Sequence, residues 1–157
     1  MSEPVYLIDT NILIEFDKWL PIALNGVFWS KLEEALKAGQ WILLDVVVDE
    51  IKYNKDLMNW CKKQQGAGLV TKVSDENRAR ALEISSQYSI IDPATGNSTV
   101  DTYIIAYAEE RGLTVFTREA RRKSTTDRYK VPDVCTELGV NSIFRPLSFL
   151  NSIKYKN

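Results

Sequence analysis

Short apolar runs alternate with longer stretches of helical spacing along this chain. The strongest runs, residues 5–8, 41–48 and 113–116, predict strands buried within a sheet. Residues 69–73 and 140–144 are further strand candidates. Strands that alternate with helices in this way predict an α/β domain, with a mostly parallel central sheet flanked by helices.

Helical spacing and end signals predict the helices between these strands. They cover residues 11–19, 27–37, 75–88, 99–111 and 132–138, with a further helix from Pro146 and two short ones within residues 49–65. Gly39, Gly112 and Gly139 follow three of these helices, at the position where glycine commonly ends a helix. Ser98 stands as the N-cap of the helix that follows it.

The composition predicts one folded domain spanning residues 1–157. The chain is 45% hydrophobic with a formal net charge of −1, so it can bury a core but carries no overall basic field. Its two cysteines, Cys61 and Cys135, lie far apart in the sequence and are expected to be buried thiols. No basic leader precedes the first apolar run, and no run approaches the ~20 residues that span a bilayer. We therefore expect a cytoplasmic protein without a membrane partner.

Carboxylates follow the predicted strands where the strands end. Asp9 follows the first run, Asp49 and Glu50 follow the second, and Glu119 comes shortly after the third. Asp101 adds an acid at the start of a predicted helix. Because the carboxyl ends of parallel strands meet at one edge of the sheet, we expect these acids to gather there.

The absence of histidine from the sequence narrows the chemistry that these acids can perform. Ser-His-Asp and Cys-His nucleophile pairs and histidine-based zinc sites are excluded. Carboxylate oxygens suit a hard cation, Mg²⁺ or Mn²⁺, which polarises phosphoryl oxygens and generates hydroxide from water. Such a site could hydrolyse phosphodiesters without histidine.

Each acid also has a structural alternative. Asp9 could cap the following helix through its side chain. Asp101 fits a capping box with Ser98, which needs no metal. Asp49 and Glu50 compete for one role, because neighbours on an extended strand face opposite ways. We choose the longer Glu50 and assign Asp49 to the first turn of a helix.

Polar neighbours could orient these carboxylates. Asn11 could hydrogen-bond to Asp9, or could be an exposed residue of the first helical turn. Thr117 could supply an orienting hydroxyl or a cap. Glu119 could face either the site or the solvent.

A basic segment, residues 118–130, follows the third strand run. Its cations are Arg118, Arg121, Arg122, Lys123, Arg128 and Lys130, and its acids are Glu119 and Asp127. We predict that the first four of these cations contact the phosphates of a nucleic acid and hold its backbone near the cation site. The alternative is a solvated loop, the usual fate of charge runs.

Four segments of the chain, taken in order, form a pattern. They are residues 6–11 (YLIDTN), 46–51 (VVVDEI), 100–108 (VDTYIIAYA) and 115–119 (VFTRE). Together they resemble the PIN-domain family of metal-dependent ribonucleases, which includes the toxins of VapBC-type toxin–antitoxin pairs. Glu119 stands where that family has Asp. The segment at residues 131–135 and the long loop before it indicate a divergent branch.

The resemblance implies a three-layer Rossmann-like fold that binds Mg²⁺ or Mn²⁺ at the carboxyl edge of its sheet and cuts single-stranded RNA. Asp9, Glu50 and Asp101 would hold the metal, and Glu119 would complete the catalytic set. The resemblance leaves a cognate antitoxin protein and a homodimer open as further partners.

Two rival functions follow from the same residues. The first is a catalytically silent PIN-like module that binds RNA or a partner protein, against which the intact Asp9, Glu50 and Asp101 argue. The second is a phosphatase of the aspartyl-phosphate type. That chemistry usually needs a second Asp two residues after the nucleophile, where this chain has Asn11.

Overall fold

The computed structural model describes residues 4–96 and 99–154, so the cap predicted at Ser98 lies outside the described residues. The elements, in chain order, are β1 (Tyr6–Ile8), α1 (Thr10–Trp19), α2 (Gly26–Lys37), β2 (Trp41–Leu44), α3 (Asp45–Glu50), α4 (Lys55–Gly66), β3 (Val70–Thr71), α5 (Asp75–Gln87), α6 (Thr99–Arg111), β4 (Thr114–Phe116), α7 (Val131–Leu138), β5 (Ser142–Ile143) and α8 (Pro146–Ser152). No helix in the described part of the chain is long and apolar enough to cross a membrane.

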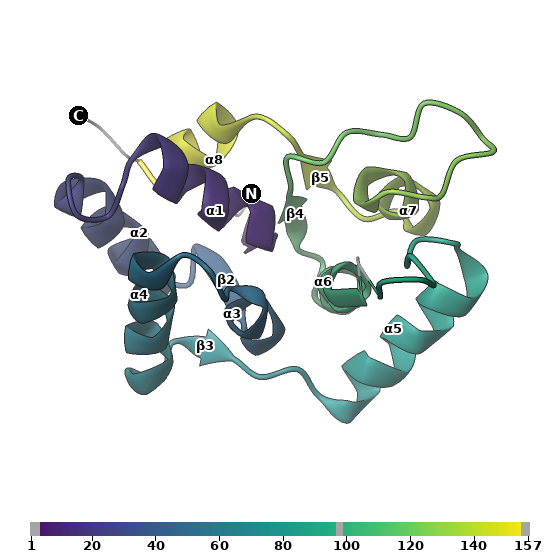
Figure 1. Ribbon diagram of the computed structural model, residues 1–157, viewed down its shortest axis with the longest axis horizontal. Helices are drawn as coiled ribbons and strands as arrows, with labels where there is room; N and C mark the ends of the chain where they lie inside the picture. The colour runs from purple at the N-terminus through teal and green to yellow at the C-terminus, as the bar shows by residue number, and fades with distance from the viewer. Residues whose placement is uncertain (1–3, 97–98, 155–157) are drawn as a thin grey trace.

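All five of these strands run parallel in one sheet, in the order β3-β2-β1-β4-β5. Helices flank the sheet: α1, α2 and α4 lie toward one side of Figure 1, and α5, α6 and α7 lie together toward the other. The predicted α/β class with a mostly parallel sheet is confirmed. The strand order reverses between β1 and β4, because the chain first builds outward to β3 and then returns to the other side of β1. Ligands of open α/β sheets bind at the carboxyl ends of the strands at such a switch point.

The register of β1 and β4 brings their ends to the same level. Ile8, the last residue of β1, pairs with Phe116, the last residue of β4. The residues that follow, Asp9 and Thr117, therefore leave the sheet side by side. The Asp9 N–H donates to the Phe116 carbonyl at 3.0 Å, which extends the pairing one step beyond the strands.

The strand predicted at residues 41–48 is wrong in its second half. β2 ends at Leu44, and Asp45 begins α3, which continues to Glu50. The Asp45 carboxylate accepts hydrogen bonds from the N–H groups of Val46 (2.9 Å) and Val73 (3.2 Å). Val47 and Val48 are buried on the inner side of this helix. A buried helical turn after a short strand has the same apolar composition as a longer strand, so composition alone did not distinguish them.

Aromatic rings fill the core between β1, β4 and the helices at the two ends of the chain. Phe16 of α1 is 2% exposed, and its ring centroid lies 5.2 Å from that of Phe28, 6.2 Å from that of Phe116 and 6.3 Å from that of Phe149. The last of these rings belongs to α8. This cluster holds α1, and with it the residue that precedes α1, against the switch point.

Phe16→Ala is expected to lower the free energy of unfolding by about 3–5 kcal/mol, because it removes the ring at the centre of this cluster and leaves a cavity. Urea unfolding measures the change. The control Leu24→Ala removes a side chain that is 82% exposed and should change stability by no more than about 0.5 kcal/mol. Equal effects from the two variants would contradict the central place of Phe16.

Candidate functional site at the switch point

Asp9 is a buried carboxylate at the end of β1. It occupies the N-cap position of α1, yet its side chain makes no capping hydrogen bond. The residue is 3% exposed. The capping alternative therefore does not account for this carboxylate.

Two neutral side chains donate to Asp9 instead. Thr117, just after β4, donates from Oγ1 to Asp9 Oδ2 at 2.9 Å, and Asn11 donates from Nδ2 to the same oxygen at 3.2 Å. The Asn11 Oδ1 in turn accepts from the Arg118 N–H at 3.3 Å. Asn11 and Thr117 thus join the end of β1 to the end of β4 and fix the orientation of the carboxylate between them.

The surroundings of Asp9 oppose its negative charge. Together they raise the pKa of Asp9 from about 4 to about 6, and burial is the largest cause. The hydrogen bond from Thr117 lowers the pKa, whereas the negative charges of Glu119 and Glu50 raise it further. Three of the predicted acids are therefore close enough to influence one another electrostatically.

Glu50 reaches the site through Thr10. The Thr10 hydroxyl, directly after Asp9 in the chain, donates to Glu50 Oε2 at 2.5 Å. Glu50 is the last residue of α3 and is exposed, as is its neighbour Asp49. We expected only one of these two acids to reach the end of β1, because neighbouring side chains on a strand face opposite ways. The two acids lie on a helix instead, where neighbouring side chains also point in different directions. Glu50 is the one that contacts Thr10.

Asp101 lies in the first turn of α6 and is half-buried. Asp101 and Asp9 both affect the pKa of Cys135, a buried thiol of α7. The pKa of Cys135 is raised to about 12, chiefly by burial; the charges of Asp9 and Asp101 also raise it, and that of Arg121 lowers it. Asp9 and Asp101 therefore both act on one buried atom beneath the edge of the sheet.

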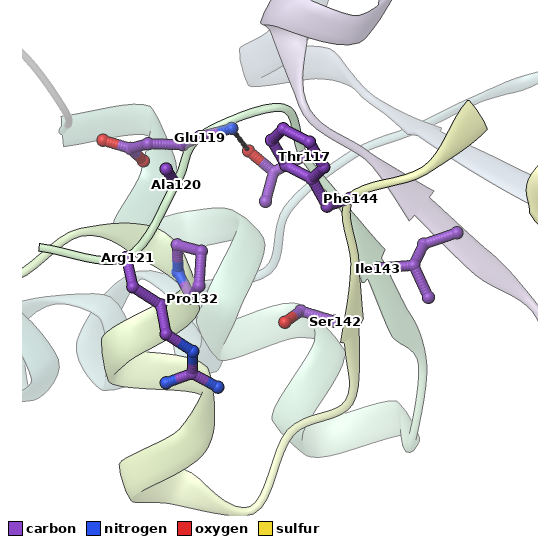
Figure 2. A pocket seen from close by; sticks show the side chains of 8 residues that line it. All are labelled: Thr117, Glu119, Ala120, Arg121, Pro132, Ser142, Ile143 and Phe144. Atoms are coloured by element: carbon purple, nitrogen blue, oxygen red, sulfur yellow. Dashed lines mark hydrogen bonds between the residues drawn. The ribbon is translucent and has the colours of Figure 1, made fainter.

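Glu119 is anchored by two backbone hydrogen bonds. Its N–H donates to Thr117 Oγ1 at 3.1 Å, and its carboxylate Oε2 accepts from the Val131 N–H at the start of α7, at 3.2 Å. Figure 2 shows its carboxylate extending away from the Arg121 guanidinium, which leaves the same loop. In this position Glu119 satisfies the first turn of α7.

The acids approach one another without forming a closed set of ligands. Within residues 4–96 and 99–154, no group of three or more Asp, Glu, Cys or His side chains is arranged to hold a metal ion. Glu50 and Glu119 instead accept hydrogen bonds from Thr10 and Val131. Rotation of these two long side chains would be needed to surround a cation beside Asp9.

Two cations of the basic segment are engaged within the fold. Arg118 pairs with Glu15 (Nε to Oε2, 3.2 Å), donates to the Phe144 carbonyl at 2.8 Å, and lies 4.0 Å from the Phe144 ring centroid. The Arg122 guanidinium stacks on the Tyr129 ring at 3.8 Å from its centroid. RNA contact by these two arginines stays a prediction. Arg121 and Lys123 are exposed.

Two hollows lie on either side of residues 119–121. The first, about 440 Å³, is lined by these residues and by Thr117, Pro132, Ser142, Ile143 and Phe144, and we call it the apolar hollow (Figure 2). The second, about 430 Å³, is lined by residues 119–121, Ile90, Lys123 and residues 127–130, and we call it the basic hollow. Thr117, which bonds to Asp9, lines the apolar hollow, and Glu119, which bonds to Thr117, lines both hollows.

Several of these site residues were missed from the sequence. Thr10 lay within the YLIDTN segment but was given no role of its own. Its bond to Glu50 depends on α3, which begins at Asp45 and not at Asp49 as the sequence indicated. Ser142 and Phe144 belong to a short strand and the residue after it, with no charge to draw attention. They lie next to Thr117 because β5 pairs with β4.

Comparisons with known proteins agree with this architecture. Residues 6–156 match the model of a family described as a domain of unknown function, DUF4411. The chain belongs to the DUF4411 family. No curated protein matches the sequence. Among solved structures, the crystal structure of FitAcB from Neisseria gonorrhoeae is similar, with a TM-score of 0.50 and 20% identity over 91% of this chain and 99% of that one. At this identity the likeness concerns the fold, which is PIN-like.

Asp9→Asn is expected to change stability in a way that depends on pH. An unfolded Asp titrates near pH 4 and the folded Asp9 near 6, so between these values the native state keeps a proton that the unfolded chain has lost, and stability falls as pH rises. The full cost to the wild type at neutral pH is about 3 kcal/mol. In chelator, the free energy of unfolding of Asp9→Asn relative to wild type should therefore rise by about 2–3 kcal/mol from about pH 4 to about pH 7.5.

Urea unfolding across this pH range measures the difference. The matched control is Asp49→Asn, at an exposed neighbour of Glu50, and its free energy of unfolding should match that of the wild type. A difference between Asp9→Asn and wild type that does not vary with pH would contradict a raised pKa at Asp9.

Proposed function

We propose that this protein is a divalent-cation-dependent endoribonuclease that cleaves single-stranded RNA. The observation that carries the proposal is the buried Asp9 carboxylate at the switch point, held by the neutral donors Thr117 and Asn11 and close to further acids. A carboxylate kept there at an electrostatic cost is characteristic of functional sites. The resemblance of four segments to PIN-domain ribonucleases and the PIN-like fold support the choice of reaction.

The residues present fit a hard cation in chemistry, because the donor set consists of carboxylate and hydroxyl oxygens. Asp9, Glu50 and Asp101 would hold Mg²⁺ or Mn²⁺, and Glu119 would assist after leaving Val131. The bound ion would supply activation of water and stabilisation of charge on the phosphate. Thr117 and Asn11 orient Asp9, and Thr10 orients Glu50.

The RNA backbone would lie along the basic hollow. Arg121, Lys123 and Lys130 line it and are exposed. Arg128 also lines it and pairs with Asp92 at 3.3 Å. Contacts of this kind bind phosphates without regard to sequence. Arg118 and Arg122, the other arginines predicted to contact phosphates, also bond to the fold and would position the segment that carries these cations.

A second candidate is a catalytically silent PIN-like module that binds RNA or a partner protein. One observation favours it: the acids of the described residues do not form a ready metal site. Calorimetric titration with Mn²⁺ separates the two functions, because a nuclease of this type must bind the cation and a silent module need not. Mn²⁺ binding that is lost in Asp9→Asn supports the nuclease.

A toxin role with a cognate antitoxin partner is a further part of the proposal. It rests on the PIN-domain resemblance, since that family includes toxins of toxin–antitoxin pairs. Toxicity of the nuclease would follow from cleavage of the host's own RNA.

Purified protein is expected to cleave single-stranded RNA with Mg²⁺ or Mn²⁺ and to stop when the cation is chelated. Asp9→Asn should lower the rate by at least ~100-fold, because the carboxylate nearest the cation is lost. Gel analysis of a labelled oligoribonucleotide gives the rate, and Asp49→Asn should cleave like wild type. Undiminished cleavage by folded Asp9→Asn would rule out this site.

Induced expression is expected to slow the growth of a bacterial host, and Asp101→Ala should relieve the effect by removing a cation ligand. Growth curves at equal protein levels measure it. Asp75→Ala is the matched control, because Asp75 is also an acid in the first turn of a helix. If Asp75→Ala relieved growth as well as Asp101→Ala does, the effect would reflect helix stability and not catalysis.

A further inference from the structure

The apolar hollow lies beside the proposed catalytic edge. Thr117 forms part of its wall (Figure 2) and also donates to Asp9, so one residue joins the hollow to the carboxylate. Its volume of about 440 Å³ falls within the ~300–1,000 Å³ of small-ligand sites. It is large enough for one planar group and too small for a folded element.

The walls of this hollow suit a flat ring. Pro132 of α7 and Phe144, which follows β5, supply apolar side-chain surface, whereas the Ile143 side chain points to the other side of β5 from Ser142 (Figure 2). The Phe144 ring is held in place, because the Arg118 guanidinium lies over it at 4.0 Å and is itself bonded to the Phe144 carbonyl and to Glu15. A rigid aromatic ring at the edge of a hollow is the kind of surface on which single-stranded nucleic acids stack their bases.

Two polar side chains in the lining would favour some nucleic-acid bases over others. The Arg121 guanidinium offers several N–H donors, and the Ser142 hydroxyl can donate or accept. Guanine presents two adjacent acceptors, N7 and O6, which match a guanidinium fork. Adenine places a donor beside its N7. Uracil and cytosine are smaller and leave more of the apolar wall uncovered.

The neighbouring basic hollow explains how a polynucleotide would reach this site. Residues 119–121 line both hollows and form the ridge between them. Lys123 and Lys130, on the basic side, suit phosphates. A strand crossing the ridge could place its backbone on the basic side and turn one base into the apolar side.

We propose that the apolar hollow binds a single unpaired purine base of RNA, with guanine preferred, and so selects the sequence that is presented to Asp9. This inference rests on the proposed function in taking RNA as the ligand. It adds a base-recognition site formed by Arg121, Ser142 and Phe144, which the proposed cation chemistry does not require.

Binding without cleavage tests this directly. Fluorescence anisotropy in chelator compares a labelled octamer of uridine with the same octamer carrying one central guanosine or one central adenosine. Wild type is expected to bind the guanosine octamer about tenfold more tightly than the uridine octamer, with the adenosine octamer between them. Equal affinities, or no RNA binding at all, would overturn the proposal.

Variants assign the preference to the hollow. Ser142→Leu fills it, and Arg121→Met removes the donor fork, so each should reduce the guanosine preference to about twofold or less. Ser30→Leu on α2 and Arg111→Met on α6 repeat the same changes at exposed positions outside the hollow and should keep the preference. Ser142→Ala serves if Ser142→Leu fails to fold, as judged by thermal melting.

The outcomes separate this proposal from the proposed function. A guanosine preference that is lost in the hollow variants supports base recognition even if no cation-dependent cleavage is found. RNA affinities that none of the hollow variants change would overturn it, and would leave the hollow to another occupant such as a segment of a partner protein.

Discussion

The structure of the site depends on one hydrogen bond, from Thr117 Oγ1 to Asp9 Oδ2. It joins the residues that follow the two neighbouring strands at which the order of the sheet reverses. Thr117 also accepts from the Glu119 N–H, so the direction of the basic segment is set at the same atom. The placement of the acid, the two hollows and the cations therefore follows from how β1 and β4 end together.

The cost of this arrangement is the burial of a carboxylate without a positive partner among its described contacts. Burial and the nearby charges of Glu119 and Glu50 oppose ionisation of Asp9. A structure that needed Asp9 only for stability would gain from an uncharged side chain of the same shape. The electrostatic cost is intelligible if the site is completed by a ligand that carries positive charge.

Much of the fold could be predicted from the sequence, because buried parallel strands leave clear apolar runs and the helix ends carry glycine signals. The positions of Asp9 and Thr117 at strand ends followed from the same reasoning, whereas the strand order that makes β1 and β4 neighbours did not. The division of residues 41–48 into β2 and the start of α3 could not be read from apolar composition, although Asp45 interrupts the run. The engagement of Arg118 with Glu15 was also out of reach, since those residues meet only through the tertiary fold.

Hydrogen bonds to the Asp133 carboxylate order the backbone of the basic segment. One oxygen of this carboxylate, Oδ2, accepts from the Arg122 N–H at 2.9 Å and from the Lys130 N–H at 3.0 Å, which closes the intervening chain into a ring. Arg122 braces the ring from inside through the carbonyls of Thr125 and Asp127. A long charged loop would otherwise lose conformational entropy whenever it engaged a ligand. Here part of that backbone entropy is already lost on folding, so a ligand would meet a loop whose backbone is already ordered.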